Sequence, residues 1–361
     1  MNDFNAEPTT KRSRVAWALA FAATAGIFAA CVIRRPAGTT APAAPAAHAA
    51  QVAPASRATP TSAPPMAAKL GAMSAAVVSA EPSPPPPPEP PPIELPRGGR
   101  PLFPEYRLVG FCGTPGAPEL GSLQGNLTAR AKALDAQAAR YAEARNADDR
   151  KLMPVFELIA VVVQGYPGPE NKYRPRVDGS VVEQFLRAAR ESKALLLLNI
   201  QPGQSDFMTE VKAYEKYLRE PDVGVALDPE WAMRPKQIPM RSFGQTTGET
   251  ITEVADYLSG LVENGKLPEK ALVFHQVNNW VLKDEPELRP APGVIFIKSV
   301  DGLGPVASKI KTYDYLTQSM ASSVHPGFKL FFDEDTRNGS RLMTPKEVLA
   351  LSPKPEYVMY E

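Results

Sequence analysis

Eight short apolar segments recur between residue 107 and the C-terminus of this 361-residue chain, and they constrain its fold more than any other feature. The segments cover residues 107–113, 153–159, 194–201, 223–230, 270–277, 293–300, 327–335 and 356–361. A stretch with the periodicity of an amphipathic helix separates most of them. Eight alternating strand and helix units over roughly 260 residues are typical of a single (β/α)₈ barrel. The sequence therefore predicts an α/β fold with one TIM-like barrel over residues 101–361.

The third segment indicates that the strands are parallel. Leucine occupies every position of residues 195–198, so polar residues do not alternate with apolar ones there. A continuous apolar run is typical of a strand covered on both faces, as in a parallel sheet surrounded by helices. A doubly wound open sheet is the alternative fold. The loop after the first segment, at residues 113–116, lacks the G-x-G-x-x-G spacing that such folds usually carry there.

Helices are predicted wherever apolar residues repeat at helical spacing between the strands. The clearest stretches are residues 123–145, 181–192, 206–219 and 249–264. Ser180 and Glu183 have the spacing of a capping box at the start of the second stretch. Prolines limit any helix within residues 278–292 to about two turns. A short final helix, which Thr344 would cap, is expected over residues 344–351.

An uncharged apolar run occupies residues 15–33 and follows a basic segment, residues 1–14. Such a run can span a bilayer as a helix or act as a secretory signal. We favour an uncleaved anchor, because two arginines follow the run immediately. Residues 28–31 also resemble a bacterial lipobox, which would place a lipid on Cys31; cleavage near residues 47–49 is a third possibility. Each alternative predicts that the remaining chain lies outside the cytoplasm, attached to or released from a membrane.

Residues 34–100 are rich in alanine, proline, serine and threonine, and they predict a disordered linker. The proline run near its end favours an extended polyproline II conformation. The formal net charge of the whole chain is +1, which gives no indication of a nucleic-acid partner. The sequence also shows no P-loop or zinc-site motif, so we predict neither a cofactor nor a bound metal.

The most concentrated chemistry lies at the end of the fourth apolar segment, where Asp228, Glu230 and Trp231 are close together. Residues two apart on a strand share a face, so the two carboxyl groups should point the same way. Carboxylates this close raise the pKa of one another, and a carboxyl group that stays protonated can serve as a general acid. Trp231 could stack on a sugar ring. In the structural alternative, Asp228 caps the next loop and Glu230 pairs with a nearby arginine such as Arg234.

Other candidates lie at or near the ends of the remaining strands. Glu157 and Asp333 are further candidate catalytic carboxylates, although Glu157 could instead form an ion pair inside the barrel with Lys298 or Lys329. Asp333 and Asp335 are expected to share a face. The candidate substrate-binding residues besides Trp231 are Asn199, Gln201, His275, Lys298 and Asp301.

The D-x-E formed by Asp228 and Glu230 resembles the catalytic pair of barrel-fold chitinases and of a family of barrel-fold lysozymes. The resemblance implies that Glu230 is the proton donor and Asp228 its partner. Chitinase-like proteins usually have another aspartate two positions earlier, where this chain has Ala226. The whole domain is also similar to uncharacterised, membrane-anchored bacterial barrel proteins, which imply no particular activity.

Three functional hypotheses follow from these residues. The first is a tethered glycoside hydrolase that acts on cell-envelope or extracellular polysaccharide, including peptidoglycan. The second is a metal-dependent hydrolase, in which carboxylates and His275 would gather around a divalent cation. The third is a non-catalytic scaffold that binds a glycan or a protein in the envelope. Fold alone does not separate them.

Overall fold

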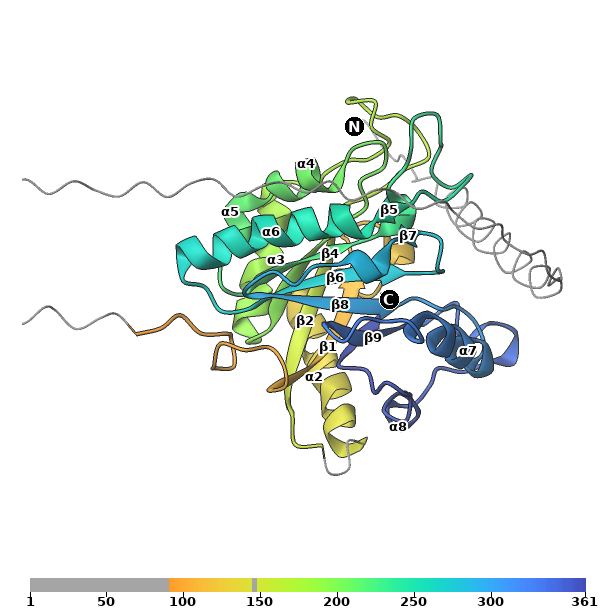
Figure 1. The fold of residues 1–361 in the computed structure, drawn as a ribbon. Coiled ribbons are helices and arrows are strands. Elements are labelled where there is room, and N and C mark those ends of the chain that lie inside the picture. Colours follow the sequence, from red (N-terminus) through yellow and green to blue (C-terminus); the bar gives the residue numbers. More distant parts are fainter. Residues whose placement is uncertain (1–90, 145–147) are drawn as a thin grey trace, which may run out of the picture. The chain divides into compact units, whose positions relative to one another are not determined.

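Eight parallel strands form a closed barrel in the computed structural model, which describes residues 91–144 and 148–361 (Figure 1). The strands are β1 (Tyr106–Gly113), β2 (Lys151–Val161), β3 (Leu195–Ile200), β4 (Val223–Leu227), β6 (Lys270–Gln276), β8 (Val294–Val300), β9 (Val324–Leu330) and β10 (Tyr357–Tyr360). Each strand pairs in parallel with the next barrel strand along the chain, and β10 closes the ring against β1. The predicted TIM-like barrel is therefore confirmed.

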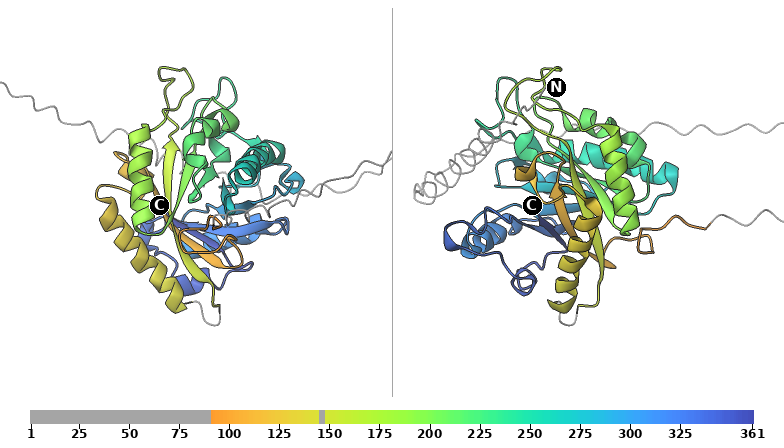
Figure 2. Two further views of the ribbon diagram at one scale, coloured as in Figure 1. Left: turned by 90° about the vertical axis from the view of Figure 1, so that its left-hand side faces the viewer. Right: turned by 180° about the vertical axis from the view of Figure 1, so that it is seen from behind.

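Helices cover the outside of the barrel (Figure 2). They are α2 (Leu127–Ala144), α3 (Gly179–Glu191), α4 (Phe207–Lys212), α5 (Glu215–Leu218), α6 (Gly248–Gly265), α7 (Val306–Thr317) and α8 (Pro345–Val348). Four short 3₁₀ turns also occur in the described chain: η1 (Pro118–Leu120), η2 (Pro229–Trp231), η3 (Glu285–Glu287) and η4 (Arg337–Gly339). A small second sheet pairs β5 (Thr246–Thr247) with β7 (Leu282–Lys283).

The irregular parts of the barrel agree with the proline pattern. Between β6 and β8 the described chain forms only the short strand β7 and the turn η3, as the prolines predicted. The final helix α8 is short, and Thr344 and Glu347 form a complete capping box at its start. The prediction that Thr344 caps the final helix is therefore confirmed.

Two helix predictions were wrong in detail. The predicted helix over residues 206–219 is divided into α4 and α5, because Tyr214 leaves the helical conformation. The hydroxyl of Tyr214 donates a hydrogen bond to the carbonyl oxygen of Ala160 in β2, which fixes this residue against the barrel. Helix α3 begins at Gly179, and its N-cap is Asp178 rather than the predicted Ser180, because the Asp178 carboxylate accepts a hydrogen bond from the backbone N–H of Ser180.

The seventh strand is displaced from its predicted position. Strand β9 spans Val324–Leu330, whereas the apolar pattern predicted a strand over residues 327–335. The chain turns directly after Leu330, and Asp335 accepts a hydrogen bond from the backbone N–H of Phe331 in that turn. The acidic residues after β9 therefore do not alternate as strand residues do.

Alternate residues of each strand point into the barrel or toward the helices. In β2, Phe156 and Leu158 join the outer apolar layer, whereas Val155 joins the inner layer. The inner layer is tight at Gly110 in β1, where a Cβ atom would lie 2.8 Å from the carbonyl oxygen of Val155. The barrel is therefore a packed core, and most of the charged side chains in its interior lie toward the carboxyl ends of the strands.

The predicted N-terminal segments lie outside the described residues, including the apolar run, Cys31 and most of the linker. Within residues 91–144 and 148–361, no helix is long and apolar enough to cross a membrane. Packing against the barrel already begins at Leu95, which is 3% exposed and belongs to the inner apolar layer.

Candidate active site

Buried polar side chains gather at the carboxyl ends of the strands and form what we call the polar cluster. It consists of Glu157, Asn199, Gln201, Asp228, Glu230, His275, Ser299, Asp301, Lys329, Tyr357 and Glu361. The inward-facing positions of seven of the eight barrel strands, or the residues directly after them, supply these groups. This arrangement is the one in which (β/α)₈ barrels carry active sites.

His275 connects two carboxylates at the centre of the polar cluster. Its Nδ1 atom lies 2.9 Å from Asp301 Oδ2, and its Nε2 atom lies 3.1 Å from Glu157 Oε1. Burial lowers the pKa of His275, but Asp301 and Glu157 outweigh this effect and raise the pKa well above its ordinary value. His275 is therefore protonated at neutral pH and lies between two carboxylates, with Nδ1 hydrogen-bonded to Asp301 and Nε2 within ion-pair distance of Glu157 but not hydrogen-bonded to it.

Lys329 supplies the second buried positive charge. Its Nζ atom lies 2.6 Å from Glu361 Oε2 and 3.3 Å from Asp301 Oδ2. Burial disfavours the ammonium form, but the pKa of Lys329 is nevertheless raised because Asp301 and Glu361 surround it. The buried positive and negative charges on this side of the barrel thus compensate each other.

Glu157 is held as a carboxylate although it is completely buried. Tyr357 donates a hydrogen bond to Oε2, and the amide of Asn199 donates one to Oε1 at 3.1 Å. Burial alone would raise the pKa of Glu157, but the charge of His275 and hydrogen bonding lower it to about 2. The predicted alternative, an ion pair of Glu157 with Lys298 or Lys329, is wrong. Glu157 lies within ion-pair distance of His275 instead, and the charge of Lys329 lowers its pKa from farther away.

Asp228 is held by two amide side chains. Asn199 Nδ2 donates to Oδ1 and Gln201 Nε2 donates to Oδ2, each at 2.9 Å. Asn199 and Gln201 therefore lie on the same side of the chain, as their spacing of two residues requires. Burial raises the pKa of Asp228, and the positive charges of His275 and Lys329 offset part of this increase. The Asp228 side chain does not cap the turn η2 that follows it.

Glu230 differs from the other acids because one of its oxygens is unpaired. Oε2 is buried, and among the described residues nothing donates a hydrogen bond to it. Burial and the neighbouring charges of Asp228 and Asp301 raise the pKa of Glu230 well above its ordinary value. The group therefore stays protonated in a range where an ordinary glutamate has ionised. Arg234 is not among the charges that act on it.

Three aromatic rings, Trp231, Phe243 and Trp280, pack in a row that begins next to Glu230 and ends at the surface. Trp231 is only 3% exposed and packs edge-on against Phe243 at a centroid distance of 5.3 Å. Phe243 in turn lies 6.1 Å from Trp280, which is 46% exposed. The ring that solvent can reach is thus Trp280, whereas the predicted sugar-stacking residue Trp231 is largely covered.

Besides Trp231, two further predicted site residues do not join the polar cluster. Lys298 points toward the helices, where its Nζ atom donates to both carboxylate oxygens of Glu285 and to the carbonyl oxygen of Leu316. Asp333 is exposed in the turn after β9. Asp335 does not accompany it, because Asp335 is fully buried and its Oδ2 lies 2.9 Å from Lys309 Nζ.

Sequence reasoning missed Ser299, Tyr357 and Glu361 and considered Lys329 only as a partner of Glu157. Strand register contains the signal that would have found them. In β9, Lys329 lies two residues after Gly327, and in the last segment Glu361 lies four residues after Tyr357. Residues an even number apart on a strand point to the same side, and Gly327 and Tyr357 are partners in the sheet, so Lys329 and Glu361 are expected to face inward together.

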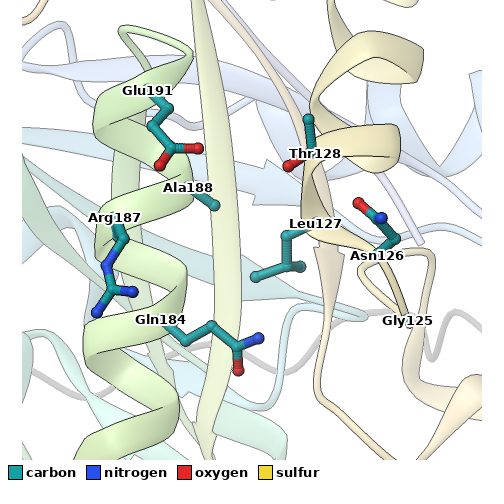
Figure 3. A pocket seen from close by; sticks show the side chains of 8 residues that line it. All are labelled: Gly125, Asn126, Leu127, Thr128, Gln184, Arg187, Ala188 and Glu191. Carbon is teal, nitrogen blue, oxygen red and sulfur yellow. The ribbon is translucent and has the colours of Figure 1, made fainter.

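Within the described residues, no group of three or more histidine, cysteine, aspartate or glutamate side chains is arranged to hold a metal ion. A separate cavity of about 320 Å³ lies between the start of α2 and the outer face of α3 (Figure 3). Gln184, Arg187 and Glu191 from α3 face Asn126 and Leu127 across it. Its lining shares no residue with the polar cluster.

Comparisons with known proteins do not assign this chain to a family. No known family profile matches the chain, and no curated protein matches it. Among solved structures, Bacillus subtilis mannanase BCman matches with 12% identity and a TM-score of 0.36, over 74% of this chain and 82% of the mannanase. Similarity this low does not extend to function. The closed strand order defines the chain as a parallel (β/α)₈ barrel protein.

Proposed function

We propose that this protein is a glycoside hydrolase in which Glu230 protonates the glycosidic oxygen and Asp228 is its partner. The observation that carries the proposal is the unpaired, buried Oε2 atom of Glu230, together with the raised pKa of this carboxyl group. A general acid must keep its proton near the working pH and must have an oxygen free to meet the substrate. Glu230 combines both properties.

Glu157 supports the proposal through its contrast with Glu230. The pKa of Glu157 is lowered to about 2, so this carboxylate remains ionised when Glu230 is protonated. Two carboxyl groups whose surroundings shift their pKa values in opposite directions suit the acid and the anionic partner of glycoside hydrolysis. In this mechanism Glu157 stabilises positive charge that develops on the sugar ring, and Asp228 holds its orientation through Asn199 and Gln201.

The substrate that we propose is a polysaccharide of the cell envelope or the extracellular space. The apolar run at residues 15–33 and the proline-rich segment at residues 34–100 support a barrel held outside the cytoplasm on a membrane tether. Membrane fractionation of cells that produce the full chain tests the tether, and a Cys31→Ala variant tests lipidation. Release of the full chain without detergent would contradict both forms of attachment.

The decisive experiment compares hydrolysis by the full chain with hydrolysis by Glu230→Gln on mannan, cellulose, chitin and peptidoglycan. Loss of the general acid should lower kcat by roughly 10²–10⁴-fold. Glu263→Gln is a matched control, because Glu263 is an exposed glutamate of α6. Equal rates for wild type and Glu230→Gln would remove Glu230 from the mechanism.

The depth of the acids favours one second candidate, a non-catalytic barrel. Glu157 is 0%, Asp228 5% and Glu230 6% exposed, so a polymer has little direct access to them. In this alternative the polar cluster only stabilises the barrel, and no polysaccharide yields a product. Glu230→Leu should be more stable than wild type in either case, so turnover separates the two candidates, because only the hydrolase has an activity to lose.

A further inference from the structure

A second polar pocket lies on the flank of the barrel, outside the polar cluster. It has a volume of about 260 Å³, slightly below the roughly 300–1,000 Å³ of pockets for drug-sized ligands. The end of β6, the segment from β7 to η3, strand β8 and the end of α7 frame it, and these elements are labelled or can be followed in Figure 1. Its size suits a ligand of one sugar unit or less.

The ammonium group of Lys298 is the main charge in the floor of this pocket, but it is already saturated. Nζ donates to Glu285 Oε1 at 2.9 Å, to Glu285 Oε2 at 2.8 Å and to the carbonyl oxygen of Leu316. An ammonium group has three N–H donors, so none remains for a ligand. The pocket therefore offers no free positive charge to a phosphate or a carboxylate.

The side-chain amide of Gln276, which also lines the pocket, has an oxygen without a hydrogen-bond donor among the described residues. It lines the pocket, its residue is 1% exposed, and no described residue donates a hydrogen bond to Oε1. A buried amide oxygen without a donor is costly, so such atoms usually have a partner. A ligand with hydroxyl or amide N–H groups would provide the missing donor.

The rim of the pocket provides an aromatic surface. Tyr315 of α7 is 50% exposed, and Asn279 Nδ2 donates a hydrogen bond to its hydroxyl group at 2.7 Å. This hydrogen bond joins α7 to the loop after β6 and fixes the ring at the entrance. Apolar ring surface beside several hydrogen-bond acceptors suits a molecule with both C–H and O–H faces.

We infer that this flank pocket binds one unit of a neutral saccharide. Tyr315 contacts the C–H face of the sugar, and Gln276 accepts a hydrogen bond from a hydroxyl or acetamido group. The Lys298–Glu285 pair forms a fixed, fully paired floor. The inference does not depend on the proposed function, because no residue of the pocket belongs to the polar cluster.

The test uses the full chain in mild detergent and measures binding of glucose, mannose and N-acetylglucosamine by saturation-transfer NMR. Two variants remove the proposed contacts, Tyr315→Ala and Gln276→Met. Each should weaken binding about tenfold, the equivalent of one good hydrogen bond or ring contact. Tyr166→Ala is the matched control, because Tyr166 is another exposed tyrosine, 64% exposed, and does not line the pocket.

Thermal unfolding of Gln276→Met gives an independent readout. Methionine is close to glutamine in size and has no polar amide, and the Gln276 oxygen has no protein donor to lose. The melting temperature should therefore stay the same or rise while sugar binding is lost. A function in stability alone would instead lower the melting temperature.

Three results would overturn the inference. The first is the absence of saturable binding of all three sugars to the wild-type chain. The second is binding that Tyr315→Ala and Gln276→Met leave unchanged, since the sugar then binds elsewhere. The third is saturation by a simple amine such as ethanolamine without binding of any sugar, because the pocket would then recognise a cation.

Discussion

The two sides of the polar cluster differ in how their charges are compensated. On the side of β2, β6, β8 and β9, the carboxylates of Glu157 and Asp301 face His275 and Lys329, and each buried charge has an opposite neighbour. On the side of β4, Asp228 is held only by amides, and Glu230 has an unpaired oxygen. On the first side the opposite charges compensate each other. On the second side Glu230 keeps its proton, and one of its oxygens has no hydrogen-bond partner among the described residues.

This difference teaches that burial by itself does not identify a functional acid. Glu157 and Glu230 are almost equally buried, yet their pKa values move in opposite directions. The distinction arises from the charges that surround each group, positive around Glu157 and negative around Glu230. Each prediction below changes one side of the polar cluster and leaves the other side intact.

The largest effect is expected when the paired side loses a positive charge. Lys329→Met removes the partner of Asp301 and Glu361, and a buried charge without a partner is strongly destabilising. The free energy of unfolding, measured with urea, should fall by about 3–5 kcal/mol. Lys283→Met serves as the control, because Lys283 is exposed. A loss no greater than in this control would contradict the compensating role of Lys329.

Acidification should weaken the paired side by a somewhat smaller amount. The pKa of Glu157 falls from an ordinary 4.5 to about 2, so its contribution is complete above pH 4.5 and disappears as the pH falls toward 2. Across this window the unfolding free energy should lose about 3 kcal/mol from Glu157. In Glu157→Gln the unfolding free energy should fall less between pH 4.5 and pH 2 than in wild type. In Glu119→Gln, which changes an exposed glutamate, it should fall as in wild type.

A smaller effect is expected on the β4 side when an amide support is removed. Gln201 donates to Asp228 and accepts a hydrogen bond from the backbone N–H of Val163. Gln201→Leu should therefore lower the unfolding free energy by about 1–3 kcal/mol, because it leaves both groups without a partner. Gln184→Leu, on the exposed face of α3, should change it much less. Equal unfolding midpoints for the two variants would contradict this role of Gln201.

The smallest change, and one of opposite sign, is expected for Glu230→Gln. The folded-state pKa of Glu230 is raised, so its favourable contribution is complete below an unfolded pKa of 4.5 and is lost as the pH rises toward the folded pKa. The variant does not ionise and should therefore be more stable than wild type at pH 8, with the difference shrinking toward pH 4. Superimposable pH profiles of the unfolding midpoint would show that Glu230 does not hold its proton.

Much of the fold could be predicted because buried strands and amphipathic helices leave periodic patterns in the sequence. The four consecutive leucines of β3 and the capping box of α8 are local signals, and both predictions were confirmed. Strand β9 was misplaced because Phe331 and Phe332 extend the apolar pattern beyond the turn. The break between α4 and α5 depends on a contact from Tyr214 to β2, which no local pattern contains.

The sequence by itself determined the parallel barrel and the position of Asp228 and Glu230 near the end of its fourth strand, although β4 ends at Leu227 and Glu230 lies in the turn η2. Only the tertiary structure decided which charges meet. It joined His275 to Glu157 and Asp301, and it turned Lys298 outward to Glu285. The physical reason is that periodicity assigns a residue to a face, whereas pairing depends on register and distance between strands that are far apart in the chain.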